Sequence, residues 1–274
     1  IQVTIRYIHS NLIQIQGKGV FNMPAAHVHY RFGKEVLDCL PFVYRKTIEK
    51  YRELYDIGLH GPDILFYNKP LSSNEINRTG YSMHDRPAAE FFEKTAALYG
   101  SFQNKEALKS YLYGFICHFT LDSTCHPYIE KMTHESHISH AELETELERY
   151  FMELDGLNPA EHIPTGHIHA TDENASVIAP CFSPITADEI KASLKGMIRC
   201  HQLLHAPKEG KRKFLYFALK LAGKYDSMQG LIMKPEANEA CRRYCVLLNN
   251  MYTEAVTIAS SLIQQYANVL DHDA

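Results

Sequence analysis

Apolar residues recur at helical spacing through most of this chain. Leu143, Leu147 and Phe151 lie four residues apart, and residues at this spacing share one face of a helix. No segment shows the sustained alternation of apolar and polar residues, with hairpin turns, that is typical of strands. The sequence therefore predicts an all-α fold. The predicted helices cover residues 41–54, 104–120, 139–152, 187–204, 214–221 and 236–270.

One long stretch lacks this periodicity. Residues 155–185 are rich in proline, glycine and histidine, which indicates a long loop. We expect His162, His167 and His169 to be solvated, with a position at the border of the site as the alternative. Pro87 stands at the start of a further amphipathic segment, where a proline in the first helical turn is common. The chain therefore has predicted helices on both sides of one irregular region.

Polar side chains interrupt the apolar pattern of residues 114–128, which read GFICHFTLDSTCHPY. His118, Asp122 and His126 recur every four residues, so two imidazoles and a carboxylate share one helical face. Burying three such groups without partners costs free energy. A divalent cation would satisfy them, because neutral imidazole and carboxylate are zinc ligands. A polar helix face, or histidines hydrogen-bonded within a core, would give the same pattern.

The next predicted helix carries more groups of this kind. His140 and Glu144 lie one turn apart and share a face. A metal ion bound by His126, His140 and Glu144 would join this helix to the preceding one. We expect His134 and His137 to lie in an exposed turn between the helices and leave them out of the site.

Two upstream segments supply further candidates. In GLHGPDILFY, at residues 58–67, the Gly-Pro pair predicts a turn, and Asp63 opens an apolar run, so its carboxylate can face inward. An N-cap aspartate is the commoner explanation of this pattern. In MHDRPAAEFF, at residues 83–92, His84 stands just before the predicted helix, where a lone histidine has no special meaning.

Taken together, these segments resemble a known family. MPAAHVHYRFGKEVL at residues 23–37, GLHGPDILFY, MHDRPAAEFF, the H-x3-D-x3-H helix and the H-x3-E pair stand in the order found in the bacterial zinc-dependent phospholipase C family. That family is related more distantly to the zinc nucleases of the same fold. The resemblance covers about residues 23–155, and five motifs in register make it specific. It implies an all-α, multi-helix bundle like that of phospholipase C and the zinc nucleases, with a metal cluster between helices.

The same resemblance implies the ligands of two or three zinc ions. Asp63, His84, His118 and Asp122 resemble the ligands of the first zinc site. His126, His140 and Glu144 resemble those of the second. His29, with Asp122 bridging, is similar to part of a third site, and His27 in the same HVHY segment is the alternative. Asp63 is also the candidate to orient or deprotonate the attacking water.

The chain departs from the family pattern in two places. Secreted phospholipases hold the third zinc also through an N-terminal tryptophan, and this chain has no tryptophan. The gap between Asp122 and His126 is shorter than in the secreted enzymes. Residues 1–22 match nothing in the family, so we expect a leader that contributes no ligand, with Met23 as the functional start.

Domain organisation follows from these limits. We expect a leader at residues 1–22, a metal domain at 23–155, a loop at 156–185, and a C-terminal helical part at 186–274 that packs on the same domain. With 274 residues the chain is long enough for one sizeable core.

Composition and charge narrow the setting. The net charge is -4, so we expect no binding to duplex nucleic acid. The one basic cluster, KEGKRK at 208–213, indicates a solvated turn, with contact to anionic lipid as the alternative. The sequence has no apolar window of about 18 residues, so we expect no transmembrane helix. Residues 1–22 lack the features of a signal peptide, and an odd number of cysteines fits a reducing compartment, so we expect a cytoplasmic protein.

The predicted function is metal-dependent hydrolysis of a phosphodiester, with water activated by a di- or trinuclear zinc cluster. The substrate is a phosphoester, for which a phospholipid, a nucleotide and a small phosphomonoester are all candidates. The alternative is a non-catalytic, metal-stabilised helical protein that binds lipid or nucleotide. An open coordination position would favour catalysis over a structural role. The oligomeric state stays open.

Overall fold

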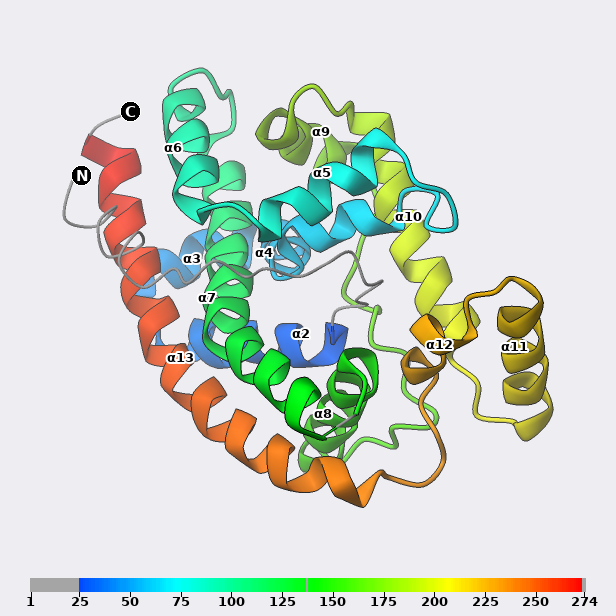
Figure 1. The fold of residues 1–274 in the computed structure, drawn as a ribbon. Coiled ribbons are helices and arrows are strands. Elements are labelled where there is room, and N and C mark those ends of the chain that lie inside the picture. The colour runs from blue at the N-terminus through cyan, green and yellow to red at the C-terminus, as the bar shows by residue number, and fades with distance from the viewer. Residues whose placement is uncertain (1–24, 137, 273–274) are drawn as a thin grey trace.

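The computed structural model describes residues 25–136 and 138–272, and this part of the chain contains helices and no strand (Figure 1). The predicted all-α class is confirmed. The leader predicted at residues 1–22, Met23 and His137 lie outside the described residues. The helices are α2 (Ala26–Cys39), α3 (Phe42–Lys50), α4 (Arg52–Gly58), α5 (Glu75–His84), α6 (Ala88–Tyr99), α7 (Lys105–Ser136), α8 (His140–Leu154), α9 (Asp172–Ile178), α10 (Ala187–Leu204), α11 (Glu209–Leu221), α12 (Tyr225–Met228) and α13 (Glu239–His272), with 3-10 turns η1 (Gly61–Tyr67), η2 (Ala179–Phe182) and η3 (Gln229–Leu231).

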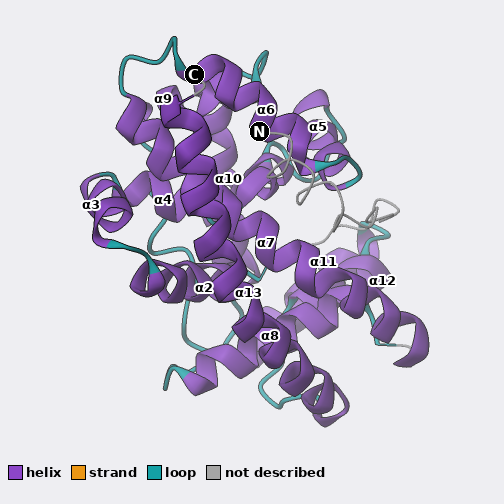
Figure 2. Cartoon of the chain, turned by 90° about the vertical axis from the view of Figure 1, so that its left-hand side faces the viewer, coloured by secondary structure: helices purple, strands orange, loops and turns teal. Residues whose placement is uncertain are grey.

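Helix α7 runs through the middle of the molecule and packs against α2, α4, α8, α13 and η1 (Figure 1). The apolar pattern predicts a helix to residue 120 and the H-x3-D-x3-H spacing extends it to His126, but α7 continues through Pro127 to Ser136. His134 therefore lies in the last turn of a helix, where it is exposed, and not in a connecting turn. Figure 2 shows the helices and their connecting loops from a second side.

Helices α4 and α7 approach closely because each has a glycine at the contact. A Cβ atom on Gly58 would lie 2.2 Å from the Tyr111 carbonyl oxygen, and one on Gly114 would lie 2.2 Å from the Tyr55 carbonyl oxygen. Both distances are far below van der Waals contact, so no side chain fits at either position. This contact brings η1, which follows α4, against the face of α7 that carries His118.

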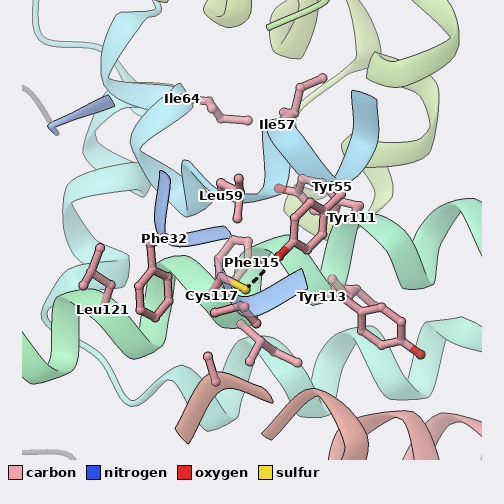
Figure 3. Close-up of a cluster of buried hydrophobic side chains, with 14 of the residues drawn as sticks. Phe32, Tyr55, Ile57, Leu59, Ile64, Tyr111, Tyr113, Phe115, Cys117 and Leu121 are labelled. Atoms are coloured by element: carbon pink, nitrogen blue, oxygen red, sulfur yellow. Dashed lines mark hydrogen bonds between the residues drawn. The ribbon is translucent and has the colours of Figure 1, made fainter. Parts of the chain in front are cut away.

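The hydrophobic core fills the space between α2, α4 and α7 (Figure 3). Phe32, Leu59 and Tyr111 are fully buried there. The Tyr55 hydroxyl donates to the Gly33 carbonyl oxygen at 2.8 Å, which satisfies its polar end. Cys117 on α7 is also fully buried. Burying each large apolar side chain in this way contributes about 1.5–3 kcal/mol to the free energy of unfolding.

The loop predicted at residues 156–185 is partly helical. Residues 172–178 form α9 and residues 179–182 form η2. The Thr171 hydroxyl accepts a hydrogen bond from the Asn174 backbone N–H at 3.1 Å, so Thr171 is the N-cap of α9. A threonine followed by two acidic residues is a signal for the start of a helix, and the prediction of a loop did not take it into account.

The remaining boundaries differ in smaller ways. The helix predicted at 41–54 is two helices, because the backbone of Tyr51 leaves the helical region with φ -125° and ψ 47°. α11 begins at Glu209, so most of KEGKRK is helical instead of a turn. α13 packs along α7, α2 and α8 (Figure 1). None of the described helices is long and apolar enough to cross a bilayer.

Candidate metal centre

The predicted ligands come from five elements and converge at one place beside α7. Their positions are His29 on α2, Asp63 on η1, His84 on α5, His118, Asp122 and His126 on α7, and His140 and Glu144 on α8. The structure brings all of them within reach of at least one other member of the set.

The first cluster contains His29, Asp63, His118 and Asp122, all buried, and one ligand atom of each lies within 4.8 Å of the others. The two oxygens of Asp122 face different imidazoles. Oδ2 lies 3.2 Å from His118 Nε2, and Oδ1 lies 3.3 Å from His29 Nε2. A carboxylate placed in this way is suited to bridge two cations.

His84 adds a fifth donor from the end of α5. Its Nε2 lies 2.9 Å from Asp63 Oδ1 and 3.9 Å from Asp122 Oδ2. Its Nδ1 donates to the Gly80 carbonyl oxygen at 3.0 Å, one turn earlier in the same helix. This hydrogen bond orients the ring, as the outer hydrogen bonds of metal-binding histidines do.

The turn before Asp63 is the reason that its carboxylate faces the cluster. Gly61 has φ 48°, and a Cβ atom there would lie 2.1 Å from the His118 ring. Glycine therefore allows the chain to pass directly against α7. Asp63 then lies within the first turn of η1, where the N-cap residue is His60, so the N-cap explanation of this aspartate is wrong.

The second cluster contains His126, His140 and Glu144, with one ligand atom of each within 4.8 Å of the others. Glu144 Oε1 lies 3.0 Å from His140 Nε2 and 3.6 Å from His126 Nε2. His126 Nε2 also lies 3.6 Å from Asp122 Oδ1. His126 and Asp122 therefore connect the two clusters along one face of α7.

Burial and mutual charge together set the protonation of these groups. Burial lowers the pKa of His118 to about 4, although Asp122 and Asp63 act in the opposite direction. Burial would also lower the pKa of His84, but Asp63 and Asp122 outweigh it and raise that pKa to about 9. The pKa of His29 is raised for the same kind of reason, because Asp122 outweighs burial.

The pKa of the Asp122 carboxyl is well below its ordinary value, because His118, His126 and His29 outweigh the effect of burial. The raised pKa values of His84 and His29 favour protons on these two rings, beside the carboxylates, when no cation is bound. Metal binding would replace those protons, since zinc takes neutral imidazole and ionised carboxylate.

Unpaired polar atoms show that the donor set fits a cation. His29 Nδ1, His118 Nδ1 and Glu144 Oε2 are buried without a hydrogen-bond partner among the described residues. Such atoms cost free energy unless a ligand or water satisfies them. Imidazole nitrogens and carboxylate oxygens in two adjacent groups match the ligand preferences of zinc.

His27 belongs to a different part of the molecule. Its Nε2 lies 3.0 Å from Asp155 Oδ2, and its backbone N–H donates to Glu148 Oε1 at 2.7 Å. His29, two residues later, is the histidine of the HVHY segment that faces Asp122.

The sequence reading missed His60, which is fully buried close to the first cluster. Its Nε2 lies 2.7 Å from Nε2 of His167, and the His167 ring stacks on Tyr30 at 4.0 Å. His167 is half-buried between these two side chains, so its expected position in solvent is wrong, and burial lowers its pKa to about 3. His169 is exposed as expected, whereas His162 is half-buried with its ring 5.5 Å from that of His27. The signal for His60 was its place inside the GLHGPD motif.

A cavity of about 320 Å³ opens beside the first cluster. His84, His118 and Asp122 line it, together with charged residues that include Arg86 and Lys94. Most of the other lining is apolar and comes from α5, α6, α7 and η2, including Met83, Phe91, Phe115, Phe119 and Phe182. A cavity with a largely apolar wall and a few polar groups is typical of a small-molecule site.

Comparison with known families gives a match to the family described as zinc-dependent phospholipase C, over residues 28–196. The matched region includes every predicted ligand from His29 to Glu144. No curated protein and no solved structure matches the chain.

Proposed function

Because this chain belongs to the zinc-dependent phospholipase C family, we propose that it is a zinc-dependent phosphoric ester hydrolase that cleaves phosphodiesters. The observation that carries the proposal is the convergence of donors from five elements into two adjacent clusters that share the α7 face. Single histidines or carboxylates on a helix have many explanations, but buried groups from distant parts of the chain rarely converge without a ligand.

The proposed ligands follow the two clusters. Asp63, His84, His118 and Asp122 would hold one zinc ion. A second would be held by His126, His140 and Glu144. A third ion would use His29 with Asp122 bridging. Bound zinc supplies Lewis-acid charge, which stabilises the phosphoryl oxygens and lowers the pKa of water.

We propose a second role for Asp63, as the group that orients the attacking water and accepts its proton. Its Oδ1 lies 2.9 Å from His84 Nε2, and His84 lines the cavity, so the carboxylate is next to the proposed substrate position. A carboxylate that accepts a proton in the rate-limiting step contributes about 10²–10⁴-fold to the rate.

The cavity supports a substrate with an apolar part. Phe91, Phe115, Phe119 and Phe182 would surround that part, while His84 marks the end where the phosphate would lie. A phospholipid combines a phosphodiester with apolar chains, so it is the proposed substrate class.

The direct test is turnover of a chromogenic phosphorylcholine ester and of a short-chain phospholipid. We expect turnover that is lost with a chelator and recovered with zinc. Asp63→Asn should reduce kcat by about 10²-fold or more. If zinc content is retained in this variant, Asp63 acts as the base, and if zinc is lost, Asp63 is a ligand.

His134→Ala is the matched control, because His134 lies on the same helix as the ligands but is exposed. It should keep both zinc and activity. A zinc-loaded protein without turnover on a broad panel of phosphodiesters and phosphomonoesters would overturn the proposal.

A further inference from the structure

Helix α11 has apolar residues on two faces. The inner face packs Leu215 and Leu219 into a small core of their own, together with Ala206 and Ile232. The outer face carries Phe214, Phe217 and Leu221 (defined here as the outer stripe), with exposed fractions of 66%, 59% and 75%. α11 is thus apolar on two faces, and the residues that the structure describes cover only one of them.

The outer stripe forms one continuous surface. Positions 214, 217 and 221 follow the spacing of a single helical face, and all three side chains are among the most exposed large apolar residues of the described chain. α11 lies at the edge of the molecule, where it packs on α12 (Figure 1). Contiguous exposed apolar surface of this kind marks an interaction site.

The charge around the outer stripe indicates the chemistry of its partner. Residues 208–224 contain six basic residues and one acidic residue, whereas the whole chain has a net charge of -4. Lys213 and Lys220 are exposed within α11, and Lys208 and Lys224 are exposed at its two ends. Aromatic and aliphatic residues bordered by lysines are typical of helices that lie in the interface of an anionic bilayer.

Two other basic residues have a different task. Lys211 Nζ donates to the His205 carbonyl oxygen at 2.6 Å, and Arg212 Nη1 donates to the Ala206 carbonyl oxygen at 2.9 Å. These bonds hold the first turns of α11 against the end of α10. The helix is therefore fixed to the body of the protein, while its outer stripe is exposed in the described part of the chain.

The position of α11 relative to the metal centre adds to this picture. Arg212 lines a small cavity that Glu144, a proposed zinc ligand, also lines. Arg212 lies on the inner side of α11, where it donates to the Ala206 carbonyl oxygen, so this cavity lies behind the outer stripe.

We propose that the outer stripe of α11 docks on an anionic phospholipid bilayer, with Phe214, Phe217 and Leu221 in the interface and the surrounding lysines on lipid phosphates. Docking is separate from hydrolysis and does not depend on the proposed function.

The test is co-sedimentation of the zinc-loaded protein with two kinds of vesicle, phosphatidylcholine alone and phosphatidylcholine mixed three to one with phosphatidylserine. We expect binding to the mixed vesicles that weakens with added salt, and much weaker binding to phosphatidylcholine alone. The double variant Phe214→Ala/Phe217→Ala should bind the mixed vesicles at least about tenfold more weakly, because two exposed rings are lost. Circular dichroism should show an unchanged helix content.

Two matched controls isolate the helix. Phe42→Ala removes a ring that is 69% exposed on α3, and it should leave binding unchanged. Lys213 pairs with Glu209 four residues away in α11, and Lys131 pairs in the same i,i+4 manner with Glu135 in α7. Lys213→Glu should weaken binding to mixed vesicles, and Lys131→Glu should not.

Vesicle binding that is equal in the native protein and the double Phe variant would overturn the proposal, as would no binding to mixed vesicles. A protein that is dimeric in solution, becomes monomeric in the double variant and binds no vesicles would show that the outer stripe is a contact between two copies. Asp122→Asn should keep vesicle binding, so failure of hydrolysis and failure of docking are distinguished.

Discussion

The predicted ligand His29 and its alternative His27 have different surroundings. His27 and His29 are almost equally buried, with exposed fractions of 6% and 5%. His27 Nε2 lies 3.0 Å from Asp155, while His29 Nε2 lies 3.3 Å from Asp122 in the first cluster. We therefore predict that His29→Ala lowers the zinc content by about one ion per chain, whereas His27→Ala keeps it.

Elemental analysis after reconstitution with zinc measures this difference. Each substitution removes one buried imidazole ring, so the two variants should lose similar amounts of stability in the metal-free state. Equal zinc loss in both variants would contradict the assignment of His29.

The pairing of His84 with Asp63 predicts how the stability of the metal-free protein depends on pH. In the metal-free protein, Asp63 and Asp122 raise the pKa of His84 from 6.5 to about 9. A raised folded-state pKa contributes stability that is fully present below the unfolded value of 6.5 and is lost as pH rises through about 9. The loss has an upper limit of about 3 kcal/mol.

Urea unfolding of chelator-treated protein between pH 6 and pH 9.5 measures this slope. His84→Gln should flatten it, because the titrating group is absent. With zinc present the slope should reverse, because binding requires neutral imidazole and strengthens as protons leave. Stability that rises with pH in the metal-free native protein would contradict the prediction.

At the scale of elements, the contact between α4 and α7 determines where η1 lies. Helix propensity alone favours alanine over glycine inside a helix by about 1 kcal/mol. At Gly114 the tertiary contact reverses this preference, because a Cβ atom would lie 2.2 Å from the Tyr55 carbonyl oxygen. We predict that Gly114→Ala destabilises the fold by about 1–3 kcal/mol or more.

Gly210 in α11 is the matched control, because nothing lies within 4 Å of a Cβ atom built there. Gly210→Ala should be neutral or stabilising by up to about 1 kcal/mol. Urea unfolding with chelator present measures both variants. A stabilising Gly114→Ala would show that α4 and α7 are not in direct backbone contact.

At the scale of the whole molecule, the metal centre connects parts of the chain that are far apart in sequence. α2 supplies His29 and α8 supplies Glu144, and η1, α5 and α7 lie between them in sequence. α13 carries no member of the two clusters but packs along α7, α2 and α8. It therefore holds the ligand-bearing helices in place from outside. The cytoplasmic location and the domain limits at residues 155 and 186 stay predictions.

Local spacing was enough to identify much of the site. His118, Asp122 and His126 lie on one face, and so do His140 and Glu144, because helical periodicity depends only on nearby residues. The all-α class follows from the same periodicity, which recurs along the chain.

Only the tertiary structure decided which side chains meet across elements. Contacts between distant residues decide that His29 and not His27 faces Asp122. They also decide how the turn at Gly61 brings Asp63 to His118, and that His60 pairs with His167. Sequence spacing cannot report these contacts, because helices of the same pattern can pack in several rotations. The arrangement is settled by which packing buries the most apolar surface and leaves the fewest polar groups unpaired.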